Sequence, residues 1–92
     1  MNYKIEKVVK VTAGTTAQSV MVRGLACLIQ NNSESAAVYF KEKSGDGKAA
    51  TASNGFALAA GKTLEVPLTA MELSIVASAA STDVRVLILD VI

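Results

Sequence analysis

The chain has 92 residues, of which 51% are hydrophobic, and its nine basic and eight acidic side chains give a formal charge of +1 without any histidine. A near-neutral chain with both signs mixed along it offers no basic face for nucleic acid, and no uncharged run reaches the roughly 18 apolar residues that a membrane span requires. A single cysteine, Cys27, cannot form an internal disulfide, and without histidine we expect no metal site.

The short length predicts a core that is completed by association. A domain of this size buries only about 60 to 65% of the surface that its unfolded chain exposes. Disulfides and metals are the usual reinforcement of such domains, and here both are excluded. Association remains, and we expect Cys27 to be a small buried apolar residue.

The first third of the chain predicts strands. Residues 3 to 11 alternate with the period of a half-buried strand, although Lys7 and Val8 break the pattern. We expect one face of this strand, or N-terminal arm, to carry Tyr3, Ile5, Val9 and Val11. Residues 18 to 31 form an apolar run interrupted at Gly24, which indicates either one bent strand with a bulge or two strands.

The middle of the chain alternates turns with short strands. Residues 31 to 35 have the Asn and Ser composition of a turn, and a strand follows with Val38 and Phe40 on one face. Residues 44 to 54 are small, polar and glycine-rich, which predicts an exposed loop. Asp46 in "SGDGK" lacks the further oxygen ligands of a calcium loop.

The stretch "NGFALAAGKTLEVPL", residues 54 to 68, resembles a phosphate-binding loop but fails its requirements. Five residues separate Gly55 from Gly61 where that loop has four, and an alternating strand pattern ending at Pro67 follows in place of a helix. We therefore predict no nucleotide cofactor. A turn at residues 59 to 62, with Gly61 at positive φ, is expected to join strands at 56–58 and 63–68.

The last segment, "DVRVLILDVI", predicts a strand that is apolar on both faces. Before it, Leu73, Ile75 and Ala77 alternate with Glu72 and Ser74 as in a strand, a short helical turn at Thr69 to Leu73 is an alternative for the start of this stretch, and a turn follows at 78–82. One face carries Val84, Val86, Ile88 and Ile92 with Asp90 among them, and the other carries Leu87, Leu89 and Val91 beyond Arg85. A strand of a sandwich normally buries one face only. A second apolar, or dry, face therefore requires cover, either from a segment of the same chain, such as the 44–62 loop, or from a neighbouring subunit.

Seven or eight short strands with frequent turns predict a single all-β domain, an antiparallel sandwich of jelly-roll type. The chemistry of catalysis is missing. There is no histidine, and the carboxylates are scattered, although two strands could bring Glu65 and Glu72 together. With four aromatic residues a sugar-binding platform is poorly supported. We predict a non-enzymatic protein that binds other protein surfaces and has no small-molecule substrate.

Three stretches resemble small β-rich virion proteins of tailed bacteriophages: "IQNNSESAAVYF", "TASNGFALAAGKTLEVPL" and "LSIVASAASTDVRVLILDV", within residues 28 to 91. The family includes capsid decoration, or cement, proteins. The resemblance implies a homotrimer on the major capsid protein, located on the virion and assembled in the bacterial cytoplasm. Another virion part (neck, tail or fibre) and a small carbohydrate-binding module are the alternatives.

The subunit contacts are predicted from the second dry face of the last strand. We expect Leu87, Leu89 and Val91 to form the interface, with Tyr3 and Ile5 beside them. These residues are the candidate oligomer or capsid contacts. No catalytic, cofactor-binding or metal-binding residue is predicted.

Overall fold

The computed structural model of the chain describes residues 3–43, 45–67 and 70–91, and within these ranges the side chains of Tyr3, Ala70, Met71 and Val91 are not described. The described residues form eight strands, which confirms the predicted all-β fold. They are β1 (Tyr3–Ala13), β2 (Gln18–Arg23), β3 (Ala26–Asn31), β4 (Val38–Glu42), β5 (Phe56–Leu58), β6 (Thr63–Pro67), β7 (Ala70–Ala77) and β8 (Thr82–Val91).

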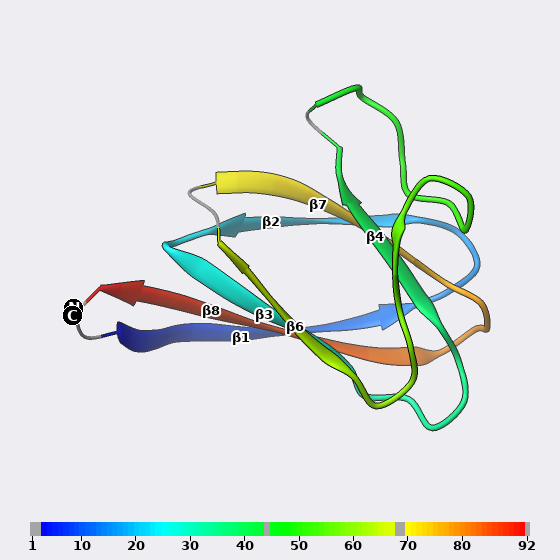
Figure 1. Ribbon diagram of the computed structural model, residues 1–92, viewed down its shortest axis with the longest axis horizontal. Coiled ribbons are helices and arrows are strands. Elements are labelled where there is room, and N and C mark those ends of the chain that lie inside the picture. The colour runs from blue at the N-terminus through cyan, green and yellow to red at the C-terminus, as the bar shows by residue number, and fades with distance from the viewer. Residues whose placement is uncertain (1–2, 44, 68–69, 92) are drawn as a thin grey trace.

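The strands form two antiparallel sheets of four, with the order β1-β8-β3-β6 in sheet A and β2-β7-β4-β5 in sheet B. Strand β1 pairs with β8, β2 with β7, β3 with β6 and β4 with β5. The chain is thus one long antiparallel hairpin, bent between β4 and β5 and rolled up into a sandwich, which is the jelly-roll arrangement. In Figure 1, β2 and β7 lie above β1 and β8, and the start of β1 and the end of β8 lie at the same end of the molecule.

The core lies between the two sheets and follows from the alternation along each strand. Sheet A contributes Val11, Cys27, Ile29, Val84, Val86 and Ile88, and sheet B contributes Val22, Val38, Phe40, Leu58, Leu73 and Ile75. All of these side chains are buried. Burial of each large aliphatic side chain contributes about 1.5 to 3 kcal/mol, so the inner faces supply most of the stability of the sandwich.

A β-bulge in β1 corrects the predicted face of that strand. The register with β8 shifts between Ile5 and Lys7, because Glu6 is an extra residue without a partner in the ladder. One extra residue moves every following side chain to the opposite face. Ile5 therefore points outward, whereas Val9 and Val11 point into the core, so placing Ile5 on one face with them was wrong.

The apolar run of residues 18 to 31 is two strands in two different sheets. The chain crosses from β2 in sheet B to β3 in sheet A at Gly24 and Leu25. A Cβ atom at Gly24 would lie 2.7 Å from the Leu89 carbonyl oxygen, and the Leu25 amide donates to that oxygen at 3.0 Å. Gly24 allows the crossing backbone to lie against β8, so of the two predicted possibilities the structure has two strands.

The 45–55 loop covers sheet B, not the last strand. The Ala50 amide donates to the buried Ser74 Oγ of β7 at 2.8 Å, and Lys41 of β4 holds the start of the loop through Asp46. The loop lies on the sheet B side in Figure 1. The expectation that this segment covers the second dry face of β8 is therefore wrong.

Residues 70–73 belong to β7, so the predicted helical turn is wrong for them, while Thr69 lies outside the described residues. Pairing with β2 and β4 on both sides of β7 outweighs the local capping signal.

The turn at residues 59 to 62 is confirmed. The Lys62 amide donates to the Ala59 carbonyl oxygen at 3.1 Å, and Gly61 has a φ of 74°.

Asn31 connects the two sheets from within the core. Its Nδ2 donates to the carbonyl oxygens of Ala36 and Leu58 at 2.9 Å each, and its Oδ1 accepts from the Ser33 amide at 3.1 Å. The side chain is fully buried. Because all its polar atoms have partners, Asn31 ties the end of β3 to β5 and shapes the turn that the sequence predicts here.

Candidate protein-binding face

The outer face of sheet A, opposite its core side, is apolar at its centre. Strands β1, β8 and β3 present Ile5, Val8, Leu87, Leu89, Ala26 and Leu28 there, and we call this set the apolar face. These residues alternate with, or lie across the bulge from, the buried residues of the same strands. The apolar face is thus a consequence of strands that are apolar on both sides.

The strand register arranges this face in rows. Leu87 is paired with Val8 of β1 on one side and with Leu28 of β3 on the other. Leu89 is paired in the same way with Ile5 and Ala26. Strand β6 extends the two rows with Glu65 and Pro67. A hollow of about 290 Å³ between Val8, Leu28 and Leu87 and the polar residues beside them deepens the centre of the face.

The apolar face is exposed to solvent in the single chain. Ile5 is 63% exposed and Val8 is 55% exposed, while Leu28, Leu87 and Leu89 are half-buried. Scattered apolar residues on a surface are ordinary, but a contiguous group of large ones marks an interaction site. Each of these side chains would gain about 25 cal/mol for every Å² removed from water.

A polar cluster borders the apolar face at one end. Arg85 donates to both carboxylate oxygens of Asp83, at 2.9 and 3.0 Å, and Asn32 donates to the same carboxylate at 3.0 Å. These hydrogen bonds, first those from Arg85 and then that from Asn32, lower the pKa of Asp83 to about 2, and the nearby charge of Lys10 acts in the same direction. Arg85 is therefore held by a carboxylate of its own chain, which lowers the cost of removing it from water.

The structure brings three of the five predicted contact residues together. Ile5, Leu87 and Leu89 lie on the apolar face, with Ile5 directly opposite Leu89. The backbones of Tyr3 and Val91 are partners in the same ladder, but their side chains lie outside the described part of the structure.

Sequence reasoning missed Val8 and Leu28. The signal for Leu28 was present, because "LACLIQ" is apolar on both faces, as β8 is. Val8 was set aside as a break in the pattern. That Val8 shares the outer face with Ile5 follows only from the bulge, which depends on pairing with a strand at the other end of the chain.

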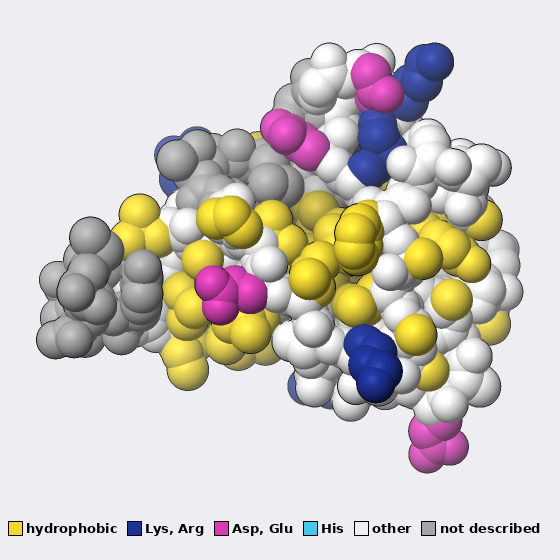
Figure 2. All heavy atoms as spheres, viewed as in Figure 1, with side chains coloured by type: hydrophobic (Ala, Val, Ile, Leu, Met, Phe, Trp, Pro, Cys, Tyr) yellow, Lys and Arg dark blue, Asp and Glu magenta, His cyan; other side chains and the backbone are white. Residues whose placement is uncertain are grey.

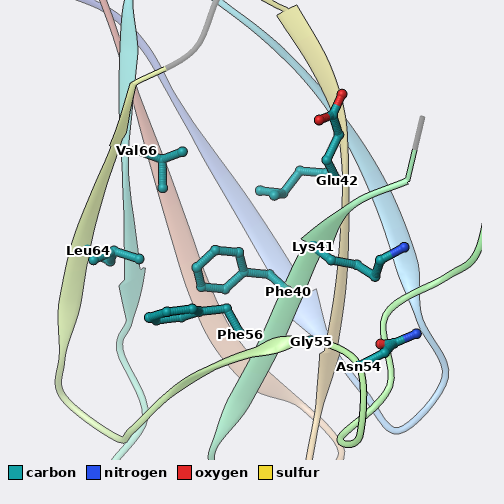
Figure 3. Close-up of a pocket in the computed structure, with 9 residues that line it drawn as sticks. Phe40, Lys41, Glu42, Asn54, Gly55, Phe56, Leu64 and Val66 are labelled. Carbon is teal, nitrogen blue, oxygen red and sulfur yellow. The ribbon is translucent and has the colours of Figure 1, made fainter. Parts of the chain in front are cut away.

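A second hollow, of about 500 Å³, opens between the sheets where β6 ends sheet A and β5 ends sheet B. We call it the open-side groove. The rings of Phe40 and Phe56 have centroids 5.6 Å apart, and Figure 3 shows them facing Leu64 and Val66 across the groove. Figure 2 shows hydrophobic side chains gathered at the centre of this side of the molecule. The groove is an apolar hollow, with Phe56 60% exposed.

Four ion pairs join charged side chains of the described residues. Glu6 is paired with Lys4, Asp46 with Lys41, Glu72 with Lys43 and Asp83 with Arg85. Glu65 and Glu72 lie on strands of different sheets, so they are not neighbours within one sheet.

The described residues contain no group of three Cys, Asp or Glu side chains arranged to hold a metal ion. Among these residues there is also no helix with the length and hydropathy to span a membrane.

Comparisons with known proteins add no identification, because no family model, curated protein or solved structure matches this chain.

Proposed function

We propose that this chain is a non-enzymatic structural subunit that acts by burying apolar surface against other protein, and that its setting is a phage particle, as a capsid decoration protein. The observation that carries the proposal is the apolar face. Ile5, Val8 and Leu87 lie together on the outside of sheet A, where the 45–55 loop does not cover them. A surface of this kind costs solubility and is retained where a partner covers it.

A decoration protein needs complementary surface and no chemistry. Many copies bind across the joints of a shell, and each adds a modest binding free energy that resists pressure from packed DNA. A near-neutral charge agrees with this role. The phage setting rests on the resemblance of residues 28 to 91, and jelly rolls also occur in capsid proteins, a fold-level analogy.

The proposal is tested by sedimenting a lysate of the native source, in which particles are seen by electron microscopy, and quantifying the chain across a density gradient by mass spectrometry. A decoration protein comigrates with intact particles at a copy number comparable to that of the major capsid protein. A few copies per particle would assign it to the neck, tail or fibre instead. Absence from the particle fractions would contradict a virion role of any kind.

A further inference from the structure

We propose that the partner of the apolar face is a second copy of this chain, related by a two-fold axis that runs parallel to the strands between β8 and β3. The inference rests on the proposed function, in which the chain acts through this face, and it names the occupant. In such an interface the same patch serves both subunits, so that each contact occurs twice.

The charges around the face suit a copy of itself. The polar residues on the outer side of sheet A include Lys10 and Arg85, which are basic, and Asp83 and Glu65, which are acidic. Two positive and two negative charges sum to zero, so two copies of the face do not repel each other. A partner with a strongly charged surface would find no complementary field here.

Three rows of paired residues cross the face from β1 to β6. The first is Ile5, Leu89, Ala26 and Pro67; the second is Val8, Leu87, Leu28 and Glu65; the third is Lys10, Arg85, Gln30 and Thr63. The proposed axis preserves the rows and exchanges β8 with β3 and β1 with β6. Leu87 then lies over the partner's Leu28, and Arg85 lies over the partner's Gln30.

The edges of the interface also match under this rotation. The partner's Glu65 comes to lie over Val8, and Lys10 is the next residue but one on the same strand, about 7 Å further along. A lysine side chain spans that distance, so each edge gains one ion pair between Lys10 and the partner's Glu65. Packed sheets cross at about 30°. The pairs named here are therefore the closest neighbours across the interface and do not lie directly opposite one another.

Other two-fold axes produce worse contacts. An axis along β8 places Arg85 over the partner's Arg85. An axis perpendicular to the strands at Leu87 places the row of Lys10 over the row of Ile5 and brings two Glu65 side chains together. Removing a charge from water without an opposite charge beside it costs several kcal/mol. The axis between β8 and β3 avoids this cost and is therefore favoured.

The size of the face predicts a weak dimer. Four strands about 4.8 Å apart and three rows about 7 Å apart give roughly 400 Å² of flat area on each subunit. With the relief of the side chains the total buried area is on the order of 1,000 Å², the lower limit for specific interfaces. We expect dissociation in the micromolar range, and the dimer leaves the open-side groove of each subunit free for another protein.

The test uses two full-length variants, Leu87→Lys and Leu28→Glu, purified separately, with one isotopically labelled. Alone, each places a charge over a leucine of the partner, and dimerisation should weaken about tenfold or more. In an equal mixture the new ammonium lies over the new carboxylate of the other chain, and the remaining contact keeps both leucines. Native mass spectrometry should therefore show a mixed dimer that neither variant forms with itself.

Leu28→Glu mixed with Met21→Lys is the matched control, because Met21 is 63% exposed on β2 of the other sheet. In this mixture Met21→Lys should dimerise with itself, and its mixed dimer with Leu28→Glu, which keeps one carboxylate over a leucine, should be weaker than the mixed dimer of the two leucine variants. Should either leucine variant fail to fold by circular dichroism, Lys10→Glu and Glu65→Lys provide the same test with exposed side chains. A wild-type monomer or trimer, or a mixture that associates no better than its components, would overturn the two-fold interface. None of these results bears on the gradient experiment, so the virion role stands or fails separately.

Discussion

Leu87 of β8 lies between Val8 of β1 and Leu28 of β3, and the three form one continuous apolar row across the outside of sheet A. The same strands present Val86, Val9 and Ile29 to the core. Both faces of sheet A are therefore built to exclude water, although the described chain covers only the inner face with a second sheet. The interface proposals follow from this excess of apolar surface.

We expect Asn31→Ala to destabilise the fold by about 2 to 4 kcal/mol. The substitution removes the side-chain partner of the Leu58 carbonyl oxygen and of the Ser33 amide, and one of the two side-chain donors to the Ala36 carbonyl oxygen. An unpaired buried polar group costs about 1 to 3 kcal/mol. Equilibrium unfolding in denaturant measures the loss. Asn32→Ala is the control, since its side chain makes an exposed bond to Asp83 and should cost well under half as much. Equal losses for the two variants would contradict a linking role for Asn31.

The stability of the fold should fall as the pH drops from about 4 to about 2, partly through Asp83. Its pKa is about 2 in the folded chain, below the value of about 3.9 for an unfolded aspartate. The ionised carboxylate thus stabilises the folded state above pH 4, and this contribution is lost on protonation. Asp46 acts in the same direction, because Lys41 lowers its pKa.

Denaturation midpoints of the wild type and Asp83→Asn at several pH values test this assignment. The variant should be less stable than the wild type at pH 6, and the two should converge near pH 2. A difference that stays constant from pH 6 to pH 2 would show that Asp83 stabilises the fold by some means other than its charge.

Gly24→Ala should destabilise the fold by about 1 to 3 kcal/mol, the usual cost of forcing atoms into a packed site. The added methyl would lie 2.7 Å from the Leu89 carbonyl oxygen and 3.0 Å from Ile88 Cγ2. Gly14→Ala is the matched control, because nothing lies within 4 Å of a Cβ at Gly14. Thermal unfolding of both variants is the measurement, and a Gly24 variant as stable as the Gly14 variant would remove the close approach as the reason for this glycine.

The strands could be predicted from the sequence because alternation is a local property. The order of the residues alone assigns Val84, Val86 and Ile88 to one side of the last strand and Leu87 and Leu89 to the other. Which sheet a strand joins is not local. The crossing at Gly24 and the bulge at Glu6 both depend on contacts with β8, some 60 to 80 positions away in the chain.

The candidate site was predicted in part for the same reason. The apolar second face of β8 gave Leu87 and Leu89, whereas Val8 required knowledge of the β1 register. Asn31 was assigned to a turn by its composition, since nothing in the sequence shows that its side chain is enclosed by Ala36 and Leu58.

Cys27 should report on unfolding of the whole sandwich. Its side chain is fully buried, and burial raises the pKa of the thiol, so the reactive thiolate is disfavoured. We expect a thiol reagent at pH 8 to label the folded chain at least about a hundredfold more slowly than the unfolded chain, because exposure requires opening of the core. Labelling should slow further as the chain concentration rises, since association stabilises the folded state. Rapid labelling of the native chain would contradict the burial of Cys27.

Sedimentation equilibrium of the wild type, Leu89→Asp and Met21→Asp over a wide concentration range examines the apolar face itself. Leu89 lies within the apolar face beside Ile5, whereas Met21 is an exposed apolar residue of the other sheet. Both variants replace a large apolar side chain by aspartate, so they differ only in where the charge is placed. We predict that the wild type and Met21→Asp associate equally, and that Leu89→Asp stays folded and monomeric. Association of Leu89→Asp at wild-type strength would show that subunits meet through another surface.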